Sequence, residues 1–176
     1  MNRSFWLAGL AGAVILFVYS AISWMVLPWN EGTLKSFPNE AAVVEVMSQV
    51  KDAGMYAYPG PQGSEGGTMP TAGPTVFAAV RPGPPAPMGP AMGIGFLIDL
   101  ASALTAAWLL MQTSGLTYWR KVCFVTALGL LASIFVQASA WNWFGYTGHF
   151  TLVQILDTTL SFALAGLGMA KILKTG

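Results

Sequence analysis

The stretch GIGFLIDLASALTAAWLLM, residues 93–111, decides the fold of this chain. It is almost wholly apolar, and its length is close to the roughly 20 residues that a helix needs to cross the hydrocarbon core of a bilayer. Its single acid, Asp99, is among the costliest residues to place inside a membrane. The stretch therefore predicts a membrane-spanning helix over residues 92–111 and raises the question of what Asp99 does there.

Three further apolar stretches predict spans at residues 5–27, 122–140 and 152–172. The composition agrees, since 55% of the 176 residues are hydrophobic and only 9% are charged, against roughly a quarter in soluble domains. An open sheet cannot satisfy its backbone in lipid, whereas helices can. The expected fold class is therefore an all-α membrane protein with four transmembrane helices in a bundle. Small residues such as Gly9, Gly12 and Gly129 recur at helical spacing and predict the packing faces of these helices.

The charges predict the orientation of the spans. The ends that must share one side of the membrane carry Arg3, Arg120, Lys121, Lys171 and Lys174. The positive-inside rule places such ends in the cytoplasm. We therefore expect a multi-pass protein of the bacterial inner membrane, with both termini cytoplasmic and residues 28–91 outside. The tryptophans fit two interfacial belts: an inner one with Trp6, Trp108 and Trp119, and an outer one with Trp24, Trp29, Trp141 and Trp143.

The long outer loop has two parts. Asn39 is a good N-cap for a short amphipathic helix over residues 39–52. Residues 59–90 form an arm rich in proline and glycine, and RPGPPAPMGP (residues 81–90) predicts neither regular helix nor sheet. GMYAY and TVFAAV are candidates for two short paired strands. The apolar helix face either packs on the bundle or, together with the arm, contacts a partner through Val43, Met47, Val50, Pro82, Pro84, Pro85 and Pro87.

Two acids lie inside predicted spans, Asp99 and Asp157. Both fall on the order of 10 Å from the same outer face at 1.5 Å rise per residue, with Gln137, Gln154, Ser23 and His149 nearby. Intramembrane acids commonly mark ion or proton paths, but they also act as structural hydrogen-bonding groups between helices. We expect Asp99 to face the bundle interior within reach of Asp157 or Gln137.

Few other residues suggest chemistry. His149 is the only histidine and is a weak candidate for binding a cofactor such as a chlorin magnesium. Catalytic motifs and a dinucleotide fingerprint are missing from the sequence. The single cysteine, Cys123, excludes an internal disulfide framework and a CxxC metal site. A net charge of +1 gives no case for nucleic-acid binding. We therefore expect no enzyme activity, no metal site and no required cofactor, while contacts with lipid or pigment stay open.

The run MVLPWNEGTLKSF, followed by NEAAVVEVM and GMYAYPGP, resembles a group of uncharacterised small bacterial four-span membrane proteins. This resemblance implies a fold but no activity. The expected function is that of a non-catalytic accessory subunit of a larger membrane complex, respiratory or photosynthetic, whose partners are other integral membrane subunits and the lipid bilayer. The alternative is a small transporter, or a proton- or cation-coupled protein, that uses Asp99 and Asp157.

Overall fold

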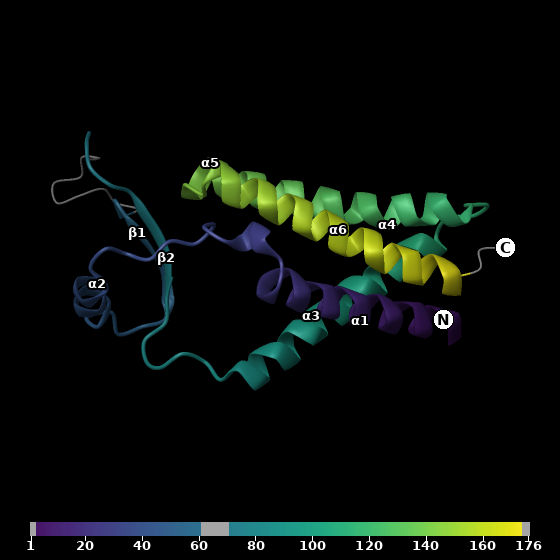
Figure 1. The fold of residues 1–176 in the computed structure, drawn as a ribbon, viewed down its shortest axis with the longest axis horizontal. Coiled ribbons are helices and arrows are strands. Elements are labelled where there is room, and N and C mark those ends of the chain that lie inside the picture. Colours follow the sequence, from purple (N-terminus) through teal and green to yellow (C-terminus); the bar gives the residue numbers. More distant parts are fainter. Residues whose placement is uncertain (1–2, 61–70, 174–176) are drawn as a thin grey trace.

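The computed structural model describes residues 3–60 and 71–173 and is mostly helical (Figure 1). Residues 61–70 of the arm and Lys174 lie outside the described residues. Four helices are long and apolar enough to cross a membrane, as the sequence predicts. They are α1 (Arg3–Met25), α3 (Met88–Met111), the continuous helix Tyr118–Phe144 and α6 (Gly148–Ile172). The third of these comprises α4 (Tyr118–Ser133), a π-helical turn η2 (Ile134–Ala138) and α5 (Ser139–Phe144).

The four long helices alternate in direction, so that the start of α1 and the end of α6 lie at the same end of the molecule (Figure 1). α4 packs along α6, and α1 packs on both α3 and α6. The structure therefore has the helices of a multi-pass membrane protein, with the long loop extending from the opposite end.

Small residues let the helices approach closely. A Cβ added at Gly12 would meet Met169 and Ala103, and one added at Gly129 would lie 2.5 Å from the Cβ of Phe162. Gly9 lies against Leu104 in the same way. In lipid, the hydrophobic effect supplies no driving force between apolar helices. Close van der Waals contacts at small residues would drive their association instead.

α3 begins at Met88, earlier than the residue 92 expected from the sequence. The prediction that residues 81–90 form no helix is therefore wrong for the last three of them. Pro90 is tolerated because it falls in the first helical turn, where backbone N–H groups have no intrahelical partner in any case.

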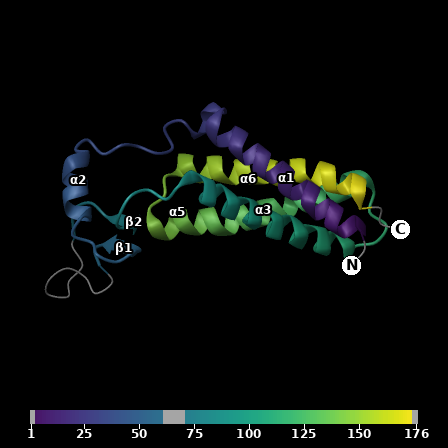
Figure 2. The same ribbon diagram turned by 90° about the horizontal axis from the view of Figure 1, so that it is seen from below.

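The loop contains η1 (Pro28–Asn30), α2 (Glu40–Met47) and a hairpin of β1 (Gly54–Tyr58) and β2 (Val76–Val80) (Figure 2). The Asn39 side chain accepts a hydrogen bond from the Ala42 N–H and caps α2. α2 ends before residue 52 because the N–H groups of Gln49 and Val50 bond only three residues back, which tightens the last turn. The two strands are antiparallel, with Tyr56 opposite Ala78.

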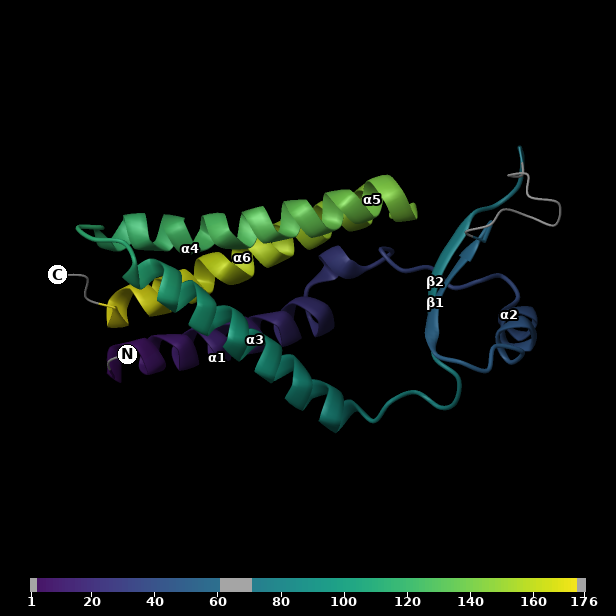
Figure 3. The ribbon, with the colours of Figure 1, turned by 180° about the vertical axis from the view of Figure 1, so that it is seen from behind.

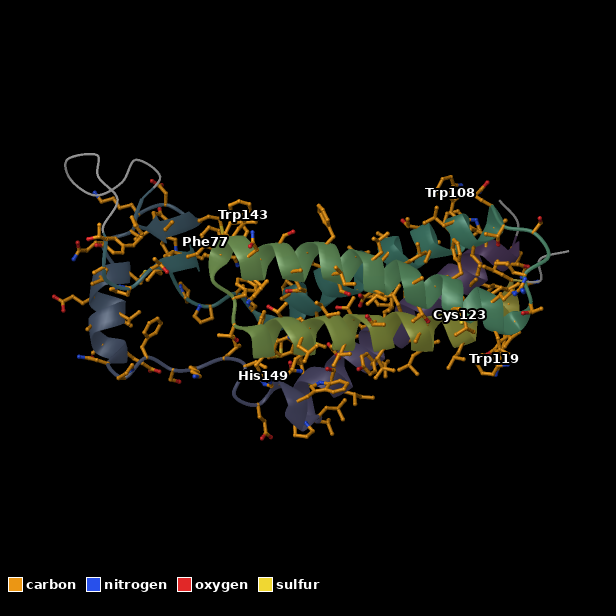
Figure 4. All side chains as sticks on the ribbon, turned by 90° about the horizontal axis from the view of Figure 1, so that it is seen from above. Phe77, Trp108, Trp119, Cys123, Trp143 and His149 are labelled. Atoms are coloured by element: carbon orange, nitrogen blue, oxygen red, sulfur yellow. The ribbon has the colours of Figure 1, made fainter. Side chains whose placement is uncertain are left out.

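The hairpin lies against the third span at the end of the bundle that carries the long loop, and we use 'outer' only as the label of this end. The ring of Phe77 in β2 stacks on that of Phe144 in α5, with 4.2 Å between the ring centroids. Trp143 lies beside this contact, whereas Trp108 and Trp119 lie at the opposite end of the bundle (Figure 4). The Phe77–Phe144 stack thus joins the hairpin to the third span.

At the end of the bundle that holds the termini, Lys121 is buried. Its Nζ donates a 2.7 Å hydrogen bond to the carbonyl oxygen of Leu173, directly after α6. A cation at this position satisfies a free carbonyl and opposes the negative end of the helix dipole. The sequence predicted Lys121 as a topology signal, and the structure adds this capping role.

Candidate functional site

The most buried acid of the spans is Asp157 in α6, which is 8% exposed. Its Oδ1 accepts two hydrogen bonds from α1, one of 2.9 Å from the Tyr19 hydroxyl and one of 2.6 Å from the Ser23 hydroxyl. Tyr19 and Ser23 are four residues apart and therefore share one face of α1. The carboxyl group thus ties α6 to α1 within the outer half of both helices.

A second layer of polar groups supports this contact from η1. Trp29 Nε1 donates to the Ser23 hydroxyl at 2.9 Å, and Asn30 Nδ2 donates to the Ser23 carbonyl at 3.2 Å. Gln154 Nε2 in turn donates to Asn30 Oδ1 at 3.4 Å. Pro28 starts the short η1 turn that brings Trp29 and Asn30 back over the end of α1. We call Tyr19, Ser23, Trp29, Asn30, Gln154 and Asp157 the polar network.

The network suits a carboxylate. Ser23 donates to Asp157 while accepting from Trp29, so the donors form a chain that ends on Oδ1. A buried polar group is tolerated when such bonds replace water. No ion pair to Asp157 is found among the described residues. The arrangement fixes the register of α1 against α6.

The other acid within the candidate spans, Asp99, is in a different environment. It is half-buried in α3, and within the described part of the chain no hydrogen bond joins its side chain to another residue. From the sequence, we expect Asp99 to lie within reach of a polar group on the third or fourth span, such as Asp157 or Gln137; no hydrogen bond joins these side chains in the described residues, and both bonds to Asp157 come from α1. Gln137 lies half-buried in the π-helical turn η2 and does not join the network.

The surroundings of Asp99 are open because α3 leaves the bundle along its outer half (Figure 3). The buried residues of α3 begin only at Ala103. Nearer the outer end, Met92 is 46% exposed, and a Cβ added at Gly95 would have no neighbour within 4 Å. The side of α3 that carries Gly95 is therefore open next to Asp99, whereas Phe96 on the neighbouring side still contacts Phe17 of α1.

Outside the bundle, the end of α2 and the proline-rich segment after β2 line two neighbouring hollows. Both segments were predicted from the sequence as contact surfaces. Met47 and Val50, at and beyond the end of α2, line a 370 Å³ hollow together with Pro82 and Arg81. A neighbouring hollow of 670 Å³ shares Arg81 and adds Pro84 and Pro85. Val43 is half-buried and Pro87 is exposed, and neither lines these hollows.

His149 is exposed near the start of α6, at the outer end of the bundle (Figure 4). In the described ranges 3–60 and 71–173, no three His, Cys, Asp or Glu side chains gather as a metal site would require. The structure therefore adds no support, within the described residues, to His149 as a candidate for binding a cofactor.

Sequence reasoning placed Asp157, Gln154 and Ser23 in one region but missed Tyr19, Trp29 and Asn30. The spacing of Tyr19 and Ser23 was a usable signal, since both polar groups fall on one face of the first span. The sequence around Trp29 and Asn30 gives no such signal, because a reversal of the chain after Pro28 is needed to bring them back to the helix.

Comparisons with protein-family models, curated proteins and solved structures find no match to this chain.

Proposed function

We propose that this chain is a non-catalytic accessory subunit of a larger bacterial membrane complex, respiratory or photosynthetic. In this proposal it lies in the cytoplasmic membrane with both termini inside the cell. The observation that carries the proposal is the outer half of α3, where the half-buried carboxyl group of Asp99 has no hydrogen-bonding partner in the described chain and Gly93 and Gly95 have open space beside them.

The physical reason is the cost of such a surface in lipid. An acid near the middle of a span costs roughly 2.5–3.5 kcal/mol on insertion scales. Glycine faces in membranes are typical of close contacts between helices, where backbones approach one another. A helix of another subunit would cover both features at once.

The loop supports the same function. The two hollows are lined by residues of α2, the hairpin and the segment after β2. α2 and the hairpin lie at the opposite end of the molecule from the termini, in the part of the chain that we place outside the cell (Figure 1). A subunit that contacts its complex both within the membrane and beside it would use both surfaces. The transport alternative is less well supported, since it needs Asp99 and Asp157 to act together, and their hydrogen bonds do not connect them.

The test is the composition of the intact particle. Native mass spectrometry after gentle solubilisation from the source membrane should give a particle that contains this chain together with at least one other integral membrane protein in fixed stoichiometry. A particle that contains only copies of this chain would contradict the proposal. Proton- or cation-dependent flux in vesicles that hold the purified chain alone would favour the transport alternative.

A further inference from the structure

We propose that Asp99 forms an ion pair with a lysine or arginine on a transmembrane helix of another protein, and that this helix packs on the face of α3 that carries Gly95 and Asp99. This inference rests on the proposed function and names the chemistry of the partner. It assigns to Asp99 the role of a recognition group within the membrane.

The face is defined by helical spacing. Ala91, Gly95 and Asp99 follow one another at four-residue intervals, so they lie along one side of α3. Gly95 has open space where a side chain would begin, and this lets the backbone of a second helix approach. A basic side chain from that helix then reaches the carboxyl group one turn further in.

The charge argument selects a basic partner. The described basic residues of this chain lie at helix ends or in the loop, namely Arg3, Lys35, Lys51, Arg81, Arg120, Lys121 and Lys171. Lys121 is already bonded to Leu173 at the far end of the bundle. The hydroxyl groups of Tyr19 and Ser23 on α1 are bonded to Asp157. Ionisable groups inside membranes pair with one another, so the complementary charge has to come from another helix.

A second copy of this chain does not supply that charge. A symmetric contact through α3 would place one Asp99 against the other, and two like charges oppose each other at close range. The outer halves of the described spans contain no lysine or arginine that a copy could offer instead. The occupant is therefore a helix from a different protein.

Photocrosslinking in the source membrane tests the contact. In one variant, p-benzoylphenylalanine replaces Met92, which lies seven residues before Asp99 and therefore on the same side of α3. In the other, it replaces Leu97, which lies on the opposite side. Leu97 is a matched control because it is 61% exposed against 46% for Met92. We expect an adduct from Met92 with a transmembrane segment of another protein, at a yield about tenfold or more above that from Leu97. Mass spectrometry should locate a lysine or arginine within one turn of the attachment point.

The charge is tested in the same Met92 crosslinking variant. Asp99→Asn should lower the adduct yield several-fold, and Asp99→Glu should retain most of it. Thermal unfolding should be alike in both variants, because Asp99 makes no hydrogen bond within the described chain. Full yield with Asp99→Asn, or loss of yield together with unfolding, would overturn the ion pair.

Other crosslinking outcomes would contradict the proposed partner. One is an adduct to lipid, to a second copy of this chain or to a helix without a basic residue. Equal yields from Met92 and Leu97, or no adduct at all, would contradict it as well. If native mass spectrometry still gives a particle with other subunits, the proposed function stands and only the contact at Asp99 is wrong. If that particle contains no other protein, the proposed function itself fails.

Discussion

Asp157 illustrates how a membrane helix accommodates an acid without a basic partner. Two hydroxyl groups of α1 point at one carboxylate oxygen, and Trp29 orients the nearer hydroxyl by donating to it. Each bond removes part of the penalty for placing a polar group in an apolar environment. The same bonds join two helices that are far apart in sequence, so the acid also contributes to the stability of the bundle.

Replacement of Asp157 separates its hydrogen bonds from its charge. Asp157→Leu leaves the hydroxyls of Tyr19 and Ser23 without their acceptor and should reduce the free energy of unfolding in detergent by about 1–2 kcal/mol, the upper part of the range for bonds between membrane helices. Asp157→Asn keeps an acceptor oxygen and should lose less than half as much. Thermal unfolding of the two variants, compared with the unsubstituted chain, measures the difference.

The control for this experiment is Leu156→Ala, next to Asp157 but 54% exposed. It removes side-chain volume without touching the network, so its unfolding should match that of the unsubstituted chain. Equal losses from Asp157→Leu and Asp157→Asn would mean that the charge, rather than the hydrogen bonds, contributes to stability.

At the scale of the elements, α3 is a helix with two environments. The alanines of its inner half are buried in the contact with α1, and its outer half is largely exposed. The sequence predicts the existence of this helix, because a long apolar run is a strong signal. It does not predict the departure of α3 from the bundle, since apolar residues that face lipid and those that face another helix are alike in composition.

The same limit applies to the expectation that Asp99 lies within reach of Asp157 or Gln137. Counting residues along a span gives its depth, and Asp99 and Asp157 were placed at similar depths for this reason. The direction in which each side chain points depends on the rotation and tilt of each helix, which packing sets. Small residues predicted the packing faces better, because Gly12 and Gly129 each occupy a position where a larger residue does not fit.

Gly129→Ala tests one of these faces. Its new methyl group would lie 2.5 Å from the Phe162 Cβ, at the contact between α4 and α6. Overpacking of this kind should destabilise the bundle by about 1–3 kcal/mol. The matched control is Gly93→Ala in α3, where nothing lies within 4 Å of the added group. Its stability should be unchanged or slightly higher, since alanine favours helix more than glycine does. Equal losses in both variants, measured by thermal unfolding in detergent, would contradict the packing of Gly129.

At the scale of the whole molecule, the two ends of the bundle differ. One end carries the start of α1, the α3–α4 connection and the end of α6, and the other carries the whole loop between α1 and α3 (Figure 1). Among the described residues, the basic ones near the first end are Arg3, Arg120, Lys121 and Lys171, and of these only Lys121 is buried. Because the two ends differ, labelling one position at each end can determine the orientation of the chain in the membrane.

We predict that the end with the termini faces the cytoplasm. Translocation of Lys and Arg near span ends is disfavoured, and the exposed Arg3, Arg120 and Lys171 all lie at that end. In a Cys123→Ser background, Ser36→Cys in the loop should react with an impermeant maleimide in intact cells. Thr117→Cys, which is equally exposed but directly precedes α4, should react only after the cells are permeabilised. The reverse pattern would invert the topology, and it would move the proposed partner contacts around Arg81 to the cytoplasmic side.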